Sequence, residues 1–409
     1  MARLLWTQKQ DFGPLPRLSH ALAFDSNRSR VVLFGGETAV GPPTVLIGDT
    51  WEWDGESWTQ VEDIGPSARK WFAMAYDRTR HRLVLFGGLT AAGAASRESW
   101  EWDGQEWTQV SETGPQARVL HAMAFDSSKN VVTLNGGLLQ RAGAPDNTLN
   151  DTWEWNGQDW TQQQDAGPNR SSHAMAYDDL RKRLVLFGGN DTQGAEAGDT
   201  WEWDGEKWTQ RTVFGPPASA NASLVFTGAE CMLFGGFHGG APQRQTWTWD
   251  GTHWTARQDI GPGARTAHAA AFDSVRQRVV LFGGIGDTPS PFGDTWEQNA
   301  DAPLSLTNFT VSTLTGAGVV GANTVSGQAT IQLSGPAPGG GVVITLSLLQ
   351  PAGITLTEGM QTTVPAGQSK MTFPIAANDI QPALTSATFT ATLQNGSALQ
   401  AEAQISLGP

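Results

Sequence analysis

The 409-residue sequence contains a single cysteine, Cys231, and two tyrosines. One cysteine excludes a disulfide within the chain and a zinc site built from several cysteines. No apolar stretch approaches the roughly 18 residues of a membrane-spanning helix, so we expect no membrane insertion. Basic residues are also scarce, because 26 Lys and Arg stand against 40 Asp and Glu, a net charge of −14. Since an acidic protein repels phosphate backbones, we expect no nucleic-acid partner.

The first residues, Met1 to Thr7, lack the apolar core and the small-residue cleavage site of a secretory signal peptide. We expect a secreted or cell-surface location if a leader has been removed, and a cytoplasmic one if residue 1 is the native start. The sequence gives no indication of the oligomeric state.

The last quarter of the sequence differs in composition from the rest. Beyond Pro303 it contains no Trp, Tyr, His, Cys or Arg, and four charged side chains remain: Glu358, Lys370, Asp379 and Glu402. Such a break predicts two domains, residues 1–300 and residues 301–409. Because the second domain has no cluster of titratable groups, we expect it to be a spacer or docking module.

Short apolar or alternating runs between Gly and Pro turns predict a β-sandwich for this second domain. Its residues 319–321 and 333–338 resemble segments of bacterial Ig-like modules. The resemblance implies an Ig-like β-sandwich.

The first domain repeats itself six times. Gly-Gly pairs begin at Gly35, Gly87, Gly136, Gly188, Gly235 and Gly283, at intervals of 52, 49, 52, 47 and 48 residues. Each pair follows an apolar run and precedes a Trp-containing stretch, which ends in Asp-Gly or Asn-Gly in the first five repeats. These dipeptides favour tight hairpin turns, and a returning strand with Trp-Thr follows. Each repeat therefore predicts four short strands.

A period near 50 residues with four strands per unit predicts a propeller rather than an open solenoid. The succession of Gly-Gly, Trp-rich strand and Trp-Thr resembles kelch repeats over residues 1–299. The sixth repeat stops at Asn299 without its Trp-Thr strand, and residues 5–8 at the N-terminus match the missing piece. We predict an all-β fold: a six-bladed kelch β-propeller whose last blade is closed by the N-terminal strand, followed by an Ig-like β-sandwich.

Five repeats carry an Arg before the first strand and an acid before the Trp-containing strand. The arginines are Arg17, Arg69, Arg118, Arg170 and Arg265, and the acids are Asp49, Glu98, Asp151, Asp199 and Asp294. The fifth repeat has Ser219 and Gln245 instead. Their joint loss predicts a bidentate Arg–carboxylate pair inside each of the other blades. The alternative is a ring of arginines around the axis that binds an anionic ligand.

A histidine follows that Arg by three residues in four repeats, as His20, His121, His173 and His268. Equivalent side chains in different blades diverge from the axis, so we expect packing and hydrogen bonding rather than a metal site. No metal ion and no other cofactor is predicted.

Departures from the repeat mark the candidate ligand-binding residues. In the second repeat Trp71 lies outside the repeated Trp positions, Phe72 replaces the histidine, and Lys70 precedes both. Two aromatic side chains and a lysine at the start of an inner strand favour a stacking platform for a sugar ring or a peptide side chain. The alternative is that Trp71 fills a gap in the packing.

The fifth repeat departs as well, because it gains Asn221, and His238 and Arg244 are polar groups without counterparts in the other repeats. Loops on a rigid scaffold commonly hold binding specificity. The long loop of the third repeat therefore adds Arg141 to the candidates, with Asp146 and Asn147 beside it.

These exceptions favour a binding protein that recognises a protein or glycan partner through the loop face of the propeller. Among known kelch catalysts, a galactose-oxidase-like copper centre is excluded, because Tyr76 and Tyr177 occupy equivalent repeat positions. The iron motif of nitrile-specifier relatives and the Tyr and Arg triad of sialidases are also missing. The resemblance leaves open a carbohydrate-active enzyme, of the sugar epimerase, mutarotase or lyase type, with its site at the axial mouth. A structural surface component is the third alternative.

Overall fold

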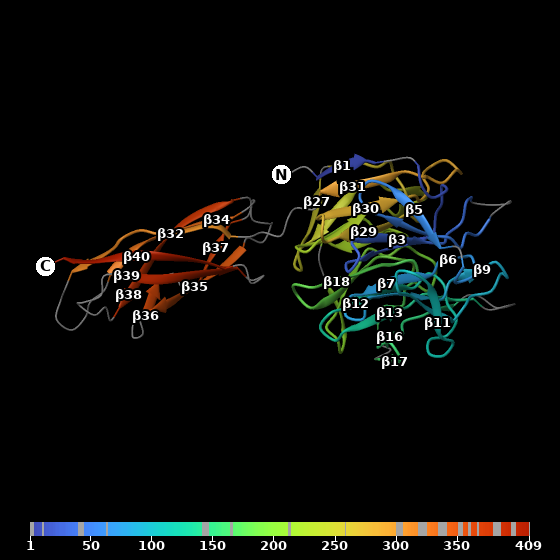
Figure 1. Cartoon of the computed structure of the whole chain (residues 1–409), viewed down its shortest axis with the longest axis horizontal. Helices are drawn as coiled ribbons and strands as arrows, with labels where there is room; N and C mark the ends of the chain where they lie inside the picture. The colour runs from blue at the N-terminus through green and yellow to red at the C-terminus, as the bar shows by residue number, and fades with distance from the viewer. Residues whose placement is uncertain are drawn as a thin grey trace. The chain divides into compact units, whose positions relative to one another are not determined.

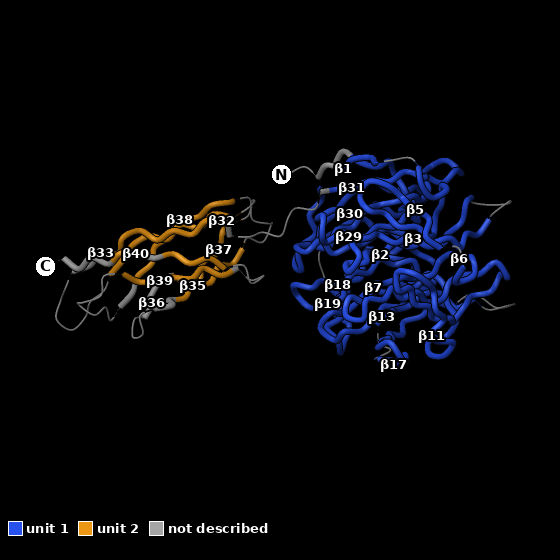
Figure 2. Tube along the Cα trace, viewed as in Figure 1, with its two compact units in different colours: residues 1–302 blue, residues 303–409 orange. Residues whose placement is uncertain are grey.

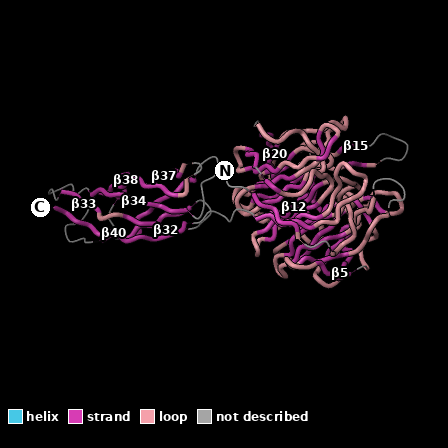
Figure 3. Tube along the Cα trace, turned by 90° about the horizontal axis from the view of Figure 1, so that it is seen from above, coloured by secondary structure: helices cyan, strands magenta, loops and turns pink. Residues whose placement is uncertain are grey.

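The structure is a computed structural model of the chain. It describes residues 4–9, 12–39, 45–62, 64–140, 147–163, 167–211, 214–257, 259–299, 306–317, 325–333, 342–350, 355–358, 361–365, 368–378, 386–393 and 398–408. The described residues form strands and loops and no helix (Figure 3). The chain divides into two compact units, residues 1–302 and 303–409 (Figure 2).

The described part of the first unit contains one principal sheet for each sequence repeat. The first sheet consists of β2 (Ala21–Asp25), β3 (Arg30–Phe34), β4 (Thr50–Trp53) and β5 (Trp58–Glu62). The second consists of β7 (Ala73–Asp77), β8 (Arg82–Phe86), β10 (Ser99–Trp102) and β11 (Trp107–Ser111). The third consists of β12 (Ala122–Asp126), β13 (Val131–Asn135), β16 (Thr152–Trp155) and β17 (Trp160–Gln162).

The next two sheets repeat this order. The fourth consists of β18 (Ala174–Asp178), β19 (Arg183–Phe187), β20 (Thr200–Trp203) and β21 (Trp208–Arg211). The fifth consists of β22 (Ser223–Phe226), β23 (Cys231–Phe234), β26 (Thr246–Trp249) and β27 (Trp254–Arg257). Small two-stranded sheets lie beside them: β6 (Arg69–Lys70) with β9 (Leu89–Thr90), β14 (Leu138–Leu139) with β15 (Asn147–Thr148), and β24 (Phe237–His238) with β25 (Ala241–Pro242).

The sixth sheet joins the two ends of this unit (Figure 1). It consists of β29 (Ala269–Asp273), β30 (Arg278–Phe282), β31 (Thr295–Asn299), β1 (Leu4–Gln8) and β28 (Asp259–Ile260). Strand β1 pairs antiparallel with β31, with Trp6 opposite Gln298. The prediction that the N-terminal strand supplies the strand missing from the last repeat is confirmed.

The first strands of the sheets contact one another in a closed cycle, β2 to β7, β12, β18, β22, β29 and back to β2. The second strand of a sheet is covered on both faces by the neighbouring sheets. In β3, the side chains from Val31 to Phe34 are fully buried. This explains why those strands are apolar throughout, since both of their faces are covered.

The tryptophans connect neighbouring sheets. The Trp58 indole N–H donates to Thr295 Oγ1 of the sixth sheet at 2.8 Å, and the Trp107 indole makes the same bond to Thr50 of the first sheet at 2.9 Å. Inside the first sheet, the Trp53 and Trp58 rings lie 5.5 Å apart. The Trp58 and Trp107 indoles therefore each belong to one sheet and bond the sheet before it.

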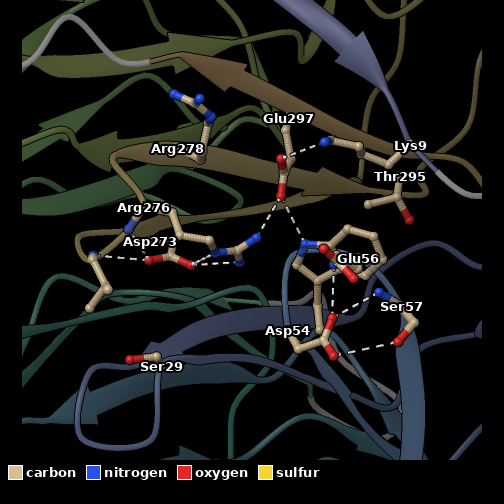
Figure 4. A network of polar contacts seen from close by, with 12 residues as sticks. Lys9, Ser29, Asp54, Glu56, Ser57, Asp273, Arg276, Arg278, Thr295 and Glu297 are labelled. Carbon is tan, nitrogen blue, oxygen red and sulfur yellow. Dashed lines mark hydrogen bonds and ion pairs between the residues drawn. The ribbon is translucent and has the colours of Figure 1, made fainter.

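A polar network holds the joint between the last and first sheets (Figure 4). The Glu297 carboxylate accepts from the Trp53 indole at 2.9 Å and from Arg276 Nη1 at 3.0 Å. Lys9 Nζ, just after β1, lies 3.3 Å from the other oxygen of Glu297. Arg276 also bonds Asp273 at 2.6 Å. One buried carboxylate thus links the N-terminal strand, the sixth sheet and the first sheet.

The second unit contains strands arranged around one apolar core. Their order is β36 (Thr355–Glu358), β38 (Lys370–Asn378), β34 (Val325–Leu333), β33 (Leu314–Ala317), β40 (Ala398–Gly408), β39 (Ser386–Leu393), β35 (Val342–Gln350) and β37 (Gln361–Val364), and β32 (Leu306–Val311) pairs with β34. Ile331, Ile344 and Phe389 are fully buried in the core. Residues 319–321 and 334–338, which contribute to the Ig-like resemblance, lie outside the described residues.

Candidate functional site

Six residues with left-handed backbone conformation lie two positions before the first strands of the sheets. They are Ser19, Trp71, Leu120, Ser172, Asn221 and Ala267, with φ between +53° and +58°. A positive φ at a residue other than glycine is uncommon, so its occurrence at the same position of every repeat marks a shared structural constraint.

Backbone hydrogen bonds join these six residues into a closed ring. Each N–H donates to the carbonyl oxygen of the equivalent residue in the preceding sheet. The bonds are Ser19 to Ala267 (2.8 Å), Trp71 to Ser19 (3.3 Å), Leu120 to Trp71 (2.8 Å), Ser172 to Leu120 (2.8 Å), Asn221 to Ser172 (2.8 Å) and Ala267 to Asn221 (3.1 Å). We call this arrangement the axial ring. It brings one residue from each of the six repeats into a single ring, with Trp71 and Asn221 three bonds apart in either direction.

Trp71 is the aromatic side chain of the axial ring, and it is partly exposed. The Lys70 ammonium lies 4.0 Å from the centroid of its ring, a cation–π contact. Lys70 Nζ also bonds Glu37 Oε2 at 2.7 Å, and that carboxylate is buried. A charge pair between the first and second sheets thus fixes the lysine against one face of the indole.

Phe72, predicted to share a platform with Trp71, lies in the core instead. Its ring is buried and packs edge-on against Phe34, 5.5 Å away. It takes the place that histidine has in other repeats. A buried ring offers no face to a ligand, so Trp71 alone provides aromatic surface at this position.

The candidates of the fifth repeat are divided between two places. Asn221 belongs to the axial ring. His238 lies in the β24–β25 hairpin, where its Nδ1 is 3.4 Å from Glu196 Oε2 of the fourth repeat, and Gly239 N–H donates to the same oxygen at 2.9 Å. Arg244 is exposed after that hairpin. Arg141 and Asp146 lie outside the described residues, and Asn147 begins β15.

The predicted Arg–carboxylate pairs are present in all five repeats that carry them, and the predicted bidentate geometry is confirmed in three. Arg17, Arg118 and Arg265 bind their aspartates through both nitrogens, at 2.6–3.0 Å. Arg69 and Arg170 each make one contact to their acid. Burial raises the pKa of Asp151, but the bonds and charge of Arg118 outweigh it and lower that pKa below its usual value. Each arginine therefore ties together two loops of its own repeat and is not aimed at a ligand.

The repeated histidines are buried and pack around the Gly-Gly pairs. A Cβ on Gly283 would lie 2.9 Å from His20 Cε1, and one on Gly36 would lie 2.9 Å from His20 Cβ. The two glycines thus make room for one histidine from each side. Burial, with a contribution from the nearby arginine, lowers the pKa of His173 and His268 to about 3. Neutral, enclosed rings of this kind are packing elements, and His268 also bonds Ser223 Oγ at 2.9 Å.

Another departure from the repeat lies in the turns between the first and second strands. These turns are at the opposite ends of the first strands from the axial ring. Arg78, after β7 of the second sheet, forms an ion pair with Asp179, after β18 of the fourth sheet. The same carboxylate accepts from Ser127 Oγ of the intervening sheet and lies 3.6 Å from Lys182 Nζ. A contact between sheets that are not neighbours must pass close to the axis. We call this arrangement the Asp179 cluster.

Sequence reasoning missed Glu37 and Asp179. Glu37 carried a usable signal, because it is the one acid directly after a Gly-Gly pair and Lys70 is the one base directly after a repeated Arg. Asp179 gave no such signal, since its partner Arg78 lies 101 residues away in a different repeat.

No group of three or more His, Cys, Asp or Glu side chains within the described ranges could hold a metal ion. Nor does that part of the chain contain a helix long and apolar enough to cross a membrane.

No protein-family profile and no curated protein sequence matches this chain. Among solved structures, the one titled "Structure of YjhT" is similar, with a TM-score of 0.57 and 14% sequence identity, and the match covers 72% of this chain and 96% of that chain. At this identity the likeness shows the fold alone. With the antiparallel four-stranded sheets, it supports an all-β propeller.

Proposed function

We propose that the chain is a kelch-type binding protein whose axial ring recognises a glycan. The proposal includes a six-bladed propeller closed by the N-terminal strand and an Ig-like sandwich in residues 301–409 that serves as a spacer or docking module. The closed cycle of first strands supports the six blades. The observation that carries the binding role is the axial ring itself, because it brings residues of all six repeats together, with the partly exposed Trp71 among them.

The side chains of the axial ring suit a sugar better than a flat protein surface. Trp71 supplies one aromatic face, and Ser19 and Asn221, which are partly exposed, supply a hydroxyl and an amide in the same ring. An aromatic face with a few polar donors and acceptors is a common composition of small-molecule sites. Lys70 is tied to Glu37, so it steadies the indole and adds no free charge.

A glycan array tests this proposal with two matched variants, Trp71→Ser and Leu120→Ser. Serine already occupies the same ring position, with the same positive φ, at Ser19 and Ser172, so both variants should fold. We expect wild type and Leu120→Ser to bind the same glycans and Trp71→Ser to lose them. If wild type binds no glycan, the proposal is wrong and a protein partner, sought by pull-down with the same variants, replaces it.

The Asp179 cluster favours a second candidate, a carbohydrate-active enzyme with its site at the opposite mouth. It brings an arginine, a carboxylate and a hydroxyl from three sheets to one place. Such a group could move a proton at an anomeric centre. Asp179→Asn should then abolish turnover of a sugar substrate and leave glycan binding at the axial ring unchanged.

For the location, we propose the cell surface or the extracellular space, where a glycan-binding propeller on a spacer module would meet its ligand. Fractionation of the source cells with an antibody to the propeller tests this.

A further inference from the structure

The fifth sheet contains a hollow in the place where the other sheets hold an arginine. Its walls include Pro216, Pro217, Ser219, Gly235, Gln245 and Trp247. Ser219 and Gln245 stand at the positions of the repeated Arg and acid. The hollow therefore lies at the positions where the ion pair stands in the other repeats.

Four of the other repeats show what this space binds. Arg17 is fully buried, and its Nη1 donates to the carbonyl oxygen of Gly35 at 3.0 Å and to Asp49 at 2.6 Å. Arg69, Arg118 and Arg265 make the same bond to the first glycine of their own Gly-Gly pairs, at 2.9–3.0 Å. In the first repeat, the Trp51 indole also donates to the Asp49 carboxylate, at 2.7 Å. Each space thus offers a backbone carbonyl and a side-chain acceptor steadied by an indole.

Both acceptors persist in the fifth sheet. Gly235, the counterpart of Gly35, lines the hollow, and among the described residues no side chain donates to its carbonyl oxygen. Gln245 Oε1 accepts from the Trp247 indole at 3.3 Å, which repeats the Trp51–Asp49 contact with a neutral acceptor. What is missing is the donor, because Ser219 is too short to reach across the space.

We propose that this hollow is a binding site for a guanidinium group that the fifth repeat does not supply itself. A guanidinium is planar and presents several N–H donors in a fixed fork, which matches a carbonyl and an amide oxygen held at set positions. A compact ammonium lacks that fork. The ligand is either a small guanidinium compound or the arginine side chain of a partner protein. Because Gln245 carries no charge, the binding is weaker than a carboxylate would give.

The experiment titrates three probes and follows the Trp247 indole N–H by NMR, with the signal assigned from Trp247→Phe. The probes are N-methylguanidinium, a capped Gly-Arg-Gly peptide and methylammonium as the cation without a fork. We expect N-methylguanidinium to shift the signal saturably in wild type. Gln245→Asp should bind it at least about tenfold more tightly, since a charged acceptor strengthens the hydrogen bond.

The matched control is the double variant Ser219→Arg/Gln245→Asp, which fills the hollow with the pair that other repeats use. It should fold, melt above wild type and give no shift with any probe. A response to N-methylguanidinium alone indicates a small ligand, and a response to the peptide as well indicates an arginine side chain. The proposal is overturned if methylammonium shifts the signal equally, if the double variant still responds, or if wild type shows no saturable shift where Gln245→Asp is saturated.

Discussion

The Lys70 ammonium bonds the buried Glu37 carboxylate at 2.7 Å, and this pair joins the second sheet to the first beside the axial ring. Between the second and third sheets the corresponding residues are Leu89 and Val119, which are apolar. The charge pair is therefore not needed to build a blade. It sets the position of the Trp71 ring, over which the same ammonium lies.

Glu37→Leu should destabilise the protein by roughly 3 kcal/mol, because it leaves the Lys70 charge largely enclosed without a partner. Glu37→Leu/Lys70→Val, which copies Leu89 and Val119 at the equivalent positions, should recover most of that loss. Urea denaturation of Glu37→Leu, Lys70→Val and the double variant measures the coupling between the two side chains. Additive losses, with no recovery in the double variant, would show that the two side chains do not form a pair in solution.

The buried histidines should make the protein less stable in mild acid. Their pKa values are lowered in the folded state. In the unfolded chain a histidine has a pKa of about 6.5, so below that pH the unfolded state binds more protons than the folded state. Their contribution is complete above pH 6.5 and declines as the pH falls, by up to about 1.4 kcal/mol per histidine per pH unit.

His173→Phe tests this reasoning, since Phe72 fills the same position in the second repeat. Between pH 6.5 and 5 the free energy of unfolding should fall less steeply in the variant than in wild type. The difference should be up to about 1.4 kcal/mol per pH unit, the effect of one bound proton. Urea midpoints across that range check it. Equal slopes would mean that His173 is not buried and neutral.

Two glycines of the second repeat should respond differently to alanine. Gly87 and Gly93 have similar φ angles, +69° and +75°, but a Cβ on Gly87 would lie 2.8 Å from the Arg118 carbonyl oxygen, whereas one on Gly93 meets nothing within 4 Å. Gly93→Ala should cost about 1 kcal/mol, the penalty of the left-handed backbone. Gly87→Ala should cost several times more, because the backbone of the next sheet must shift. Thermal unfolding that ranks the two variants in the opposite order would contradict the packing described here.

Removing the closing contact should weaken the whole propeller. Trp6 is buried against Phe234 of the fifth sheet, with ring centroids 5.2 Å apart. Trp6→Ala should therefore lower the free energy of unfolding by about 3–5 kcal/mol, as for other buried aromatic residues. Chemical denaturation followed by circular dichroism measures it. A loss below about 1 kcal/mol would show that β1 contributes little to closure.

Periodicity predicted the contacts that repeat. The arginines pair with acids of the same repeat, and their joint absence from the fifth repeat was visible in the sequence. The position of β1 was equally accessible, because the sixth repeat lacked one strand and residues 5–8 matched it.

Contacts between different repeats could not be read in the same way. Phe72 looked like a surface residue because it broke the pattern, yet an apolar ring fits the histidine's buried position without change to the backbone. The pairing of Arg78 with Asp179 depends on how sheets that are not neighbours approach the axis, and no spacing in the sequence encodes that distance. Arg141 lies outside the described residues, so its predicted role stays a prediction.

Equilibrium binding of the strongest array glycan to Trp71→Ser and Leu120→Ser tests the central claim most directly. The account predicts that Leu120→Ser binds within a few-fold of wild type, and that Trp71→Ser loses at least about 2 kcal/mol, roughly thirtyfold in Kd, as expected for a central aromatic contact. Equal affinities for the two folded variants would contradict a glycan site on the axial ring.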